Sequence, residues 1–182
     1  MKKLTLLIAL VFLLLNTVMS QEKSSPNPFY SEFKTLFGVP PFNLIKTEHY
    51  LPAVIRGIDE QQAEIDAIVN NPAAPTFENT ILAYDKSGKL LEKVSSVFGS
   101  LNGANTNPEM QAVARQISPL TTTHRDNISL NDKLFQRIKT VYLKRDSSNL
   151  DFDQKRVVEK YYSDFVRNGA DLNAEDKEKL RE

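Results

Sequence analysis

The sequence has no cysteine, and glycine accounts for only 6 of its 182 residues. Without cysteine, the chain forms no disulfide bond, has no thiol nucleophile and offers no thiolate to a zinc ion. Sandwiches and barrels of β-strands use many glycine-containing tight turns, so the low glycine content disfavours those folds. The lack of cysteine does not by itself indicate a cellular compartment.

The chain also lacks an excess of charge of either sign, since 23 lysines and arginines balance 23 aspartates and glutamates. Proteins that bind nucleic acids through phosphates normally carry a basic excess, so we expect no nucleic-acid partner. The composition is otherwise ordinary, with 41% hydrophobic and 25% charged residues. At this length, such a composition predicts a globular domain with a substantial core.

The first twenty residues have the layout of a secretory signal peptide. Two lysines precede an apolar run at 4–15, and the compact residues Val18 and Ser20 follow it. This pattern predicts a signal peptide at 1–20 that is cleaved after Ser20, and a mature protein that is exported to the periplasm or outside the cell. A membrane span needs about 20 apolar residues, so an uncleaved anchor is the weaker alternative. After cleavage we expect no membrane association.

Residues 21–45 are interpreted as a linker followed by an extended arm. Residues 21–28 are polar. In the segment that follows, the prolines at 40 and 41 prevent a long helix. The arm carries the large apolar residues Phe29, Tyr30, Phe33, Leu36, Phe37 and Phe42. Because aromatic side chains mostly stabilise proteins by burying area, we expect these to pack into grooves of a helical body.

From residue 46 to 182, apolar residues recur at three- and four-residue steps, as on one face of a helix. The first helix begins at Tyr50 and ends at Asn70; its predicted apolar face comprises Leu51, Val54, Ile55, Ile58, Ile65, Ile68 and Val69. Thr76 is a typical N-cap for a second helix, which continues to Leu101. Gly88 lies inside this second helix and predicts a kink or a close helix contact.

Four more helix starts follow, at Asn107, Asn131, Asp151 and Asn173, each with an N-capping side chain. Pro119 is expected to bend or end the third helix. Phe165 and Val166 belong to the predicted apolar face of the fifth helix, which Gly169 ends in the left-handed conformation. Since no strand pattern or internal repeat occurs, the sequence predicts an all-α fold, an antiparallel multi-helix bundle with short connections.

The last segment, 174–182, favours a helix but has only Leu180 as an apolar anchor. A short helix of this kind is marginal unless it is extended or packed. We therefore interpret 46–182 as an N-terminal helical domain that is truncated in its last helix.

Catalytic chemistry is not indicated by the residues themselves. The two histidines, His49 and His124, form no H-E-x-x-H pair and are expected to be structural, the first near a helix start and the second near a helix end. Lys86, Lys89 and Lys93 are interpreted as a solvated helix face rather than an anion site. Hence no catalytic or metal-binding residue is assigned, and substrate-binding residues remain unknown.

Several segments, taken together in this order, resemble the thimet-oligopeptidase-like zinc metallopeptidases. They are residues 37–42, 45–53, 63–68, 75–81, 87–91, 130–135 and 165–170. The block Pro75-Thr76-Phe77-Glu78-Asn79-Thr80 is the most specific of them. Within the family, the chain is most similar to the peptidyl-dipeptidases, also called dipeptidyl carboxypeptidases, with oligopeptidase A as a sister branch. Thr47 departs from the family pattern, which has proline there.

The resemblance covers 27–182 and implies the N-terminal helical region of such an enzyme, which forms one wall of a channel for oligopeptide substrates. In that family, zinc is held by an H-E-x-x-H helix and a later glutamate, and this sequence contains neither. The resemblance therefore implies zinc and monomeric peptidase activity for a full-length member, and an inactive fragment with no bound zinc here. The alternative is a free-standing exported helical module that binds peptides or is purely structural. If this is a fragment, surfaces that pack on the rest of the enzyme should be exposed apolar patches.

Overall fold

The structure, a computed structural model, describes residues 26–181. The predicted signal peptide and the start of the linker lie outside the described residues, and the domain boundaries stay a prediction. The described part of the chain forms helices joined by turns and irregular segments, and it contains no strand. The predicted all-α fold is therefore confirmed. No helix within 26–181 combines the length and the apolar content required to cross a membrane.

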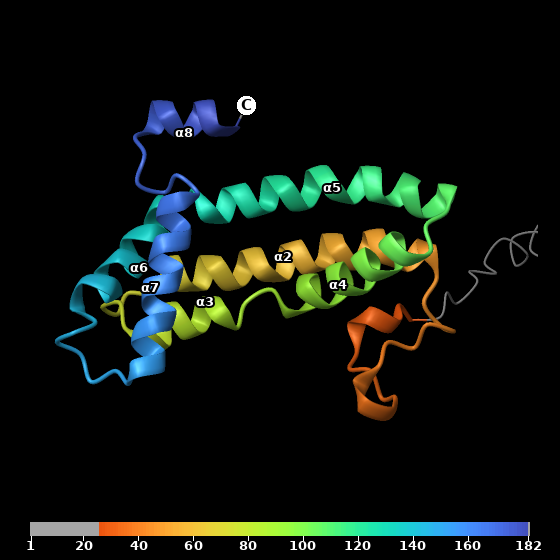
Figure 1. The fold of residues 1–182 in the computed structure, drawn as a ribbon, viewed down its shortest axis with the longest axis horizontal. Coiled ribbons are helices and arrows are strands. Elements are labelled where there is room, and N and C mark those ends of the chain that lie inside the picture. The colour runs from red at the N-terminus through yellow and green to blue at the C-terminus, as the bar shows by residue number, and fades with distance from the viewer. Residues whose placement is uncertain (1–25, 182) are drawn as a thin grey trace, which may run out of the picture.

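Short helical turns precede and interrupt the main helices (Figure 1). In chain order the elements are η1 (Pro28–Tyr30), η2 (Leu36–Gly38), η3 (Thr47–His49), α2 (Tyr50–Val69), η4 (Phe77–Leu82), α3 (Ala83–Asp85), α4 (Lys89–Ala104), α5 (Pro108–Ser129), α6 (Asp132–Lys144), α7 (Phe152–Arg167) and α8 (Ala174–Arg181). The turns η1 to η3 are 3₁₀ helices, and η4 is a π-helical turn.

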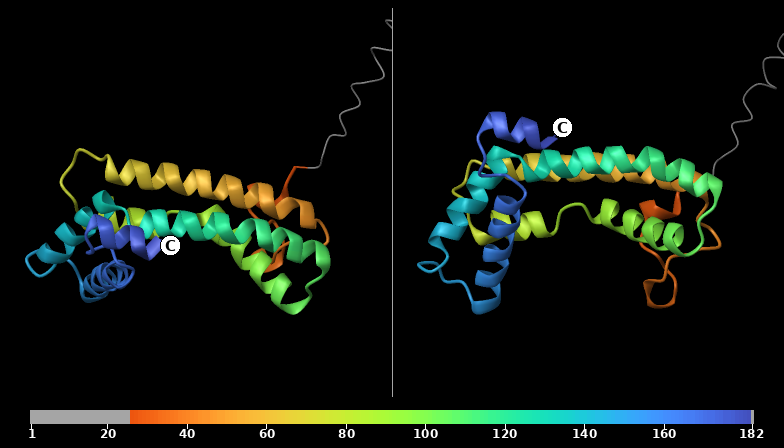
Figure 2. Two further views of the ribbon diagram at one scale, coloured as in Figure 1. Left: turned by 90° about the horizontal axis from the view of Figure 1, so that it is seen from above. Right: turned by 45° about the horizontal axis from the view of Figure 1, so that its top comes forward.

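The long helices α2, α4 and α5 lie side by side, and α6 and α7 pack across one end of them (Figures 1 and 2). The long helices alternate in direction along the chain, so α2 and α5 are parallel to each other and α4 is antiparallel to both (Figure 1). The predicted antiparallel order of neighbours therefore holds for α2, α4 and α5, whereas α6 crosses the end of α5.

The predicted N-caps set the helix starts. The side-chain oxygens of Thr76, Asn107, Asn131, Asp151 and Asn173 each accept a hydrogen bond from the backbone N–H three residues later, at 2.8–3.2 Å. Each bond satisfies one of the N–H groups that has no partner inside the first turn. At the other end of α7, Gly169 adopts the predicted left-handed conformation, with φ of 86°.

The predicted second helix is in fact broken. It comprises η4, α3 and α4, and the break falls at Gly88, whose φ is 74°. A Cβ atom on Gly88 would lie 2.4 Å from Nε2 of Gln61 on α2, so the chain both kinks and approaches α2 closely here.

Of the two outcomes predicted for Pro119, a bend or an end of the helix, the end is wrong, because α5 continues to Ser129. The ring of Pro119 lies on the solvent side, whereas Ile117, His124 and Ile128 of the same helix are buried. Packing of those side chains against the body holds the helix together across the missing N–H.

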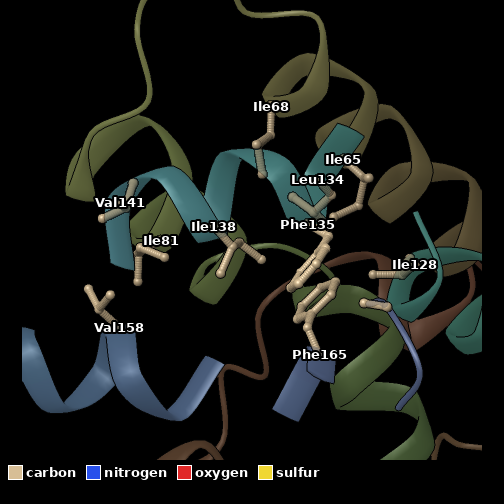
Figure 3. Close-up of a cluster of buried hydrophobic side chains, with 11 residues drawn as sticks. Ile65, Ile68, Ile81, Ile128, Leu134, Phe135, Ile138, Val141, Val158 and Phe165 are labelled. Atoms are coloured by element: carbon tan, nitrogen blue, oxygen red, sulfur yellow. The ribbon is translucent and has the colours of Figure 1, made fainter. Parts of the chain in front are cut away.

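The buried apolar residues form two clusters at opposite ends of α2. The first, here called the arm cluster, comprises Phe29, Tyr50, Ala53, Val54, Val94, Val97, Phe98, Met110 and Ile117. The second, the α6–α7 cluster, comprises Ile65, Ile68, Ile81, Ile128, Leu134, Phe135, Ile138, Val141, Val158, Phe165 and Ala170 (Figure 3). Since α2 contributes to both, it joins the two ends of the fold. Ile55, predicted on its apolar face, is instead exposed.

The arm follows the prediction only in part. Phe29 is fully buried against Tyr50, and Phe33 packs beside it. Tyr30, Leu36, Phe37 and Phe42, in contrast, are exposed, so the prediction that they fill grooves of this body is wrong. The turns at residues 35–45 direct this part of the arm away from the helices.

The last helix, α8, packs back on the body. Leu180 approaches Gly169 so closely that a Cβ there would lie 2.6 Å from Cδ2 of Leu180. Lys177 is buried and forms an ion pair with Asp132 at the start of α6. This ionic anchor was not predicted, because its partner lies 45 residues away in the sequence.

Candidate functional site

A pocket of about 420 Å³ lies between α2, α3, α4, α5 and α7. Its lining comprises Gln61, Tyr84, Leu91, Thr121, His124, Arg125, Ile128, Ser129, Tyr161, Asp164, Phe165, Arg167 and Asn168. The break at Gly88 helps to form it, since α3 and α4 contribute different walls. The pocket therefore sits between the arm cluster and the α6–α7 cluster.

Gln61 is the central polar residue of this region. Its Oε1 lies 3.0 Å from Nε2 of His124, and its Nε2 donates to Oγ of Ser87 at 3.4 Å. An amide oxygen only accepts, so His124 donates, which places the proton of the neutral imidazole on Nε2. Nearby, the N–H of Gly88 donates to Oε2 of Glu64 at 2.7 Å. These bonds connect α2, α5 and the helix break.

Burial lowers the pKa of His124 below its ordinary value of 6.5, and the charge of Asp59 opposes this shift in part. The side chain is 6% exposed. A buried imidazole favours its neutral form because water no longer solvates the cation. His124 is therefore a neutral hydrogen-bond donor in a pair that joins α2 and α5, whereas its place near a helix end in the sequence would have suited a protonated imidazole.

Two tyrosines form the aromatic side of the pocket. The rings of Tyr84 and Tyr161 are 5.1 Å apart, edge to face, and Phe165 lies 5.6 Å from Tyr84. The hydroxyl of Tyr161 donates to Asp85. Burial, and then this hydrogen bond to a carboxylate, raise the pKa of Tyr161 above its ordinary value. Burial also raises the pKa of Tyr84, so both tyrosine hydroxyls stay protonated near neutral pH.

The rim of the pocket carries two arginines and one aspartate. Arg125 on α5 and Arg167 at the end of α7 are both exposed and line the opening. Asp164 lies on the same wall, where Lys160 pairs with it at 2.7 Å. With apolar walls and guanidinium groups at the edge, the pocket suits a ligand that has an apolar part and a carboxylate.

The other predicted histidine, His49, is far from this pocket. Its Nδ1 accepts from the N–H of Lys46 at 3.0 Å, and its carbonyl accepts from Nδ2 of Asn27 at 2.8 Å. The prediction of a capping histidine is thus confirmed. Gln61, the partner of His124, lies 12 residues beyond His49, or roughly 18 Å along α2. The two histidines therefore cannot share a metal ion.

The lysines on the second predicted helix behave differently from one another. Lys86 and Lys89 are exposed, as expected for a solvated face. Lys93 instead donates to the carbonyl of Ser31 at 3.1 Å and lies 5.1 Å from the ring of Phe33. Lys93 thus holds the arm on α4, a contact that the helical pattern alone did not predict.

Zinc does not fit the residues described in the structure. Within 26–181 no group of three or more histidines, aspartates or glutamates is placed to bind a metal ion. A zinc site in a peptidase requires about three protein ligands and one open position.

Comparison of the sequence with known proteins identifies relatives among the peptidases. Dipeptidyl carboxypeptidase of Salmonella typhimurium is 40% identical over 157 residues, which is 86% of this chain and 23% of that protein. Dipeptidyl carboxypeptidase of Escherichia coli K12 is 41% identical over 155 residues, 85% of this chain and 23% of that protein.

This chain is homologous to the dipeptidyl carboxypeptidases. Oligopeptidase A of Salmonella typhimurium is a more distant relative, 25% identical over 148 residues. No family model matches the sequence. The chain spans 23% of the length of the dipeptidyl carboxypeptidases that it matches. The predicted resemblance to this peptidase family is therefore confirmed.

Sequence analysis alone did not find the pocket. The one signal for it was Gln61, a polar residue that interrupts the apolar stripe between Ile58 and Ile65. A polar side chain at such a position needs a partner from another helix. Only the fold shows that α5 supplies this partner, His124.

Proposed function

We propose that this chain is the N-terminal helical part of an exported zinc peptidase that removes dipeptides from the carboxyl end of oligopeptides. The observation that carries the proposal is the 40% identity over 157 residues with a dipeptidyl carboxypeptidase. At this identity over 86% of the chain, a shared fold and a shared place in the enzyme are the simplest explanation.

In this role the helices form one wall of the substrate channel, and the pocket beside Gln61 faces an apolar peptide side chain. The described residues lack a metal-binding group. Zinc is accordingly held by residues outside this sequence, and the 182-residue chain alone is inactive. The enzyme acts as a monomer in the periplasm or outside the cell, after cleavage of the signal peptide behind Ser20.

The test compares the 182-residue chain with the complete product of the gene's reading frame. We expect the complete product to release dipeptides from a blocked-N-terminus oligopeptide, a chelator to stop it, and added zinc to restore it. The 182-residue chain should release none. Dipeptide release by the 182-residue chain, or none by the complete product, would contradict the proposal. Mass spectrometry of the secreted protein checks the cleavage site, where Gln21 should be the first residue.

A further inference from the structure

The two most exposed large apolar side chains of the described residues are neighbours in one loop. Phe37 is 93% exposed and Leu36 is 78% exposed. Val39, Phe42 and Leu44 of the same segment are also exposed. Single exposed apolar residues are common on protein surfaces, but five within nine residues indicate an interaction surface. We call residues 36–44 the docking loop.

The docking loop holds its shape by its own hydrogen bonds. The N–H of Gly38 donates to the carbonyl of Thr35 at 3.1 Å, and the N–H of Leu44 donates to the carbonyl of Pro41 at 2.8 Å. The hydroxyl of Thr35 donates to the carbonyl of Val39. A preorganised loop loses little conformational entropy when it binds, so its apolar side chains are presented ready for contact.

Phe37 also has an unfavourable backbone conformation. Its φ of 58° and ψ of 18° lie in the left-handed region, and no other non-glycine residue of the described chain has a positive φ. An aromatic residue in this region costs free energy, and such strain persists where surrounding contacts offset it. In this chain the Phe37 side chain faces solvent. The hydrogen bonds around Thr35 hold the backbone in this conformation, but the exposed Phe37 ring gains almost no packing contact among the described residues.

Charge indicates what kind of surface would provide that contact. No charged residue lies between Lys34 and Lys46. The docking loop thus matches an apolar socket better than an acidic or basic surface.

The relatives indicate where such a socket could be. The match to the Salmonella dipeptidyl carboxypeptidase leaves at most 25 of the 182 residues outside the alignment, so the docking loop falls inside it. The same match covers only 23% of that protein. In the relative, therefore, this region belongs to a much larger body.

We propose that the docking loop inserts Phe37 and Leu36 into an apolar socket on the rest of the peptidase, outside this sequence, and so fastens the helical unit to the catalytic body. The inference rests on the proposed function, because it requires a longer polypeptide. It adds the surface that joins the two parts.

The natural absence of cysteine in this chain makes a direct test possible. Val39→Cys places a reporter thiol in the docking loop without removing Phe37. Phe152→Cys is the control, because Phe152 is 72% exposed and lies at the start of α7, in the other half of the fold. The rate of maleimide labelling is measured for both, in the 182-residue chain and in the complete gene product, after subtraction of labelling in the unsubstituted protein.

In the 182-residue chain both variants should react quickly. In the complete product, Val39→Cys should react about tenfold or more slowly, as expected for a site that opens only locally, while Phe152→Cys stays fast. Adding Phe37→Asp to the Val39→Cys variant should restore fast labelling. A matched Phe152→Asp substitution should not.

Fast labelling of Val39→Cys in the complete product would overturn the inference. So would protection in the 182-residue chain that depends on its concentration, which indicates a second copy, or on phospholipid vesicles, which indicates a membrane. Dipeptide release is measured on the same samples. An active product with a reactive loop refutes the docking inference alone, and a protected loop without dipeptide release refutes the proposed function alone. A reading frame that ends at Glu182 refutes both.

Discussion

The arm cluster and the α6–α7 cluster both consist of buried side chains, but they are closed in different ways. Most side chains of the α6–α7 cluster lie on the main helices α2, α5, α6 and α7, with stacked rings such as Phe135 and Phe165, 10° from parallel. The arm cluster is closed by Phe29, which lies in the short turn η1 before the main helices; the segment around it is held through Asn27 and Lys93. The arm cluster can therefore open when the arm segment detaches, whereas the α6–α7 cluster opens only when one of its helices detaches.

The largest expected effect is in the α6–α7 cluster. Phe135→Ala should lower the free energy of unfolding by about 3–5 kcal/mol, because it removes a buried ring and leaves a cavity between α6 and α7. Urea denaturation followed by circular dichroism measures this loss as a lower midpoint.

Phe29→Ala is the matched change in the arm cluster. Phe29 is as buried as Phe135. Its substitution can nevertheless lower the free energy of unfolding by no more than the free energy with which the arm packs on the helices. We expect a smaller shift in the urea midpoint than for Phe135→Ala, and faster trypsin cleavage after Lys34. Equal midpoint shifts for the two variants would contradict the difference between the clusters.

A second prediction concerns the contact between α2 and α4 beside the arm cluster. A Cβ on Gly57 would lie 2.8 Å from backbone atoms of Leu91, so Gly57→Ala forces the two helices apart. We expect a loss of about 1–3 kcal/mol, as for other overpacked sites. Thermal unfolding measures it.

Gly99→Ala is the control for that change. Gly99 lies on α4 with nothing within 4 Å of its Cβ position. Alanine there should stabilise the helix by up to about 1 kcal/mol. If both variants destabilised the protein equally, the close contact at Gly57 would not be the cause.

The sequence predicted the helix ends well, because those signals are local. Asp151 with Gln154, and Gly169, act within one turn of the chain, and the structure has each in its predicted role. The pocket could not be predicted in this way. Gln61 and His124 are 63 residues apart, and they meet because two long helices pack in a particular register.

The exposed residues illustrate the same limit. Val166 was predicted on the apolar face of α7, but it is 37% exposed. Periodicity identifies the side of a helix that is apolar, whereas the width of the buried stripe depends on the neighbouring helices. For Phe37, the sequence predicted burial, but the side chain is exposed among the described residues.

A third prediction concerns the polar contact between the two clusters. The folded state holds the pKa of His124 below 6.5, so on lowering the pH the unfolded chain takes up a proton before the folded chain does. Stability should therefore be greatest above about pH 6.5 and fall as the pH is lowered from there. His124→Gln should reduce this dependence, measured as urea midpoints from pH 8 to pH 5. An unchanged slope in the variant would show that other groups cause it.

The smallest expected effect is at the outer end of the arm. Phe37→Gly removes a side chain that is 93% exposed and relieves its left-handed conformation. The relief of about 1–2 kcal/mol is partly offset by the greater freedom of glycine in the unfolded chain. In the 182-residue chain the net change should be a stabilisation of less than about 1 kcal/mol, measured by thermal unfolding. In the complete gene product the same substitution should destabilise, because there the Phe37 ring would lose its apolar socket. If Phe37→Gly stabilised both proteins, the strained conformation of Phe37 would not be offset by a packing contact in the complete gene product, and no socket would be indicated.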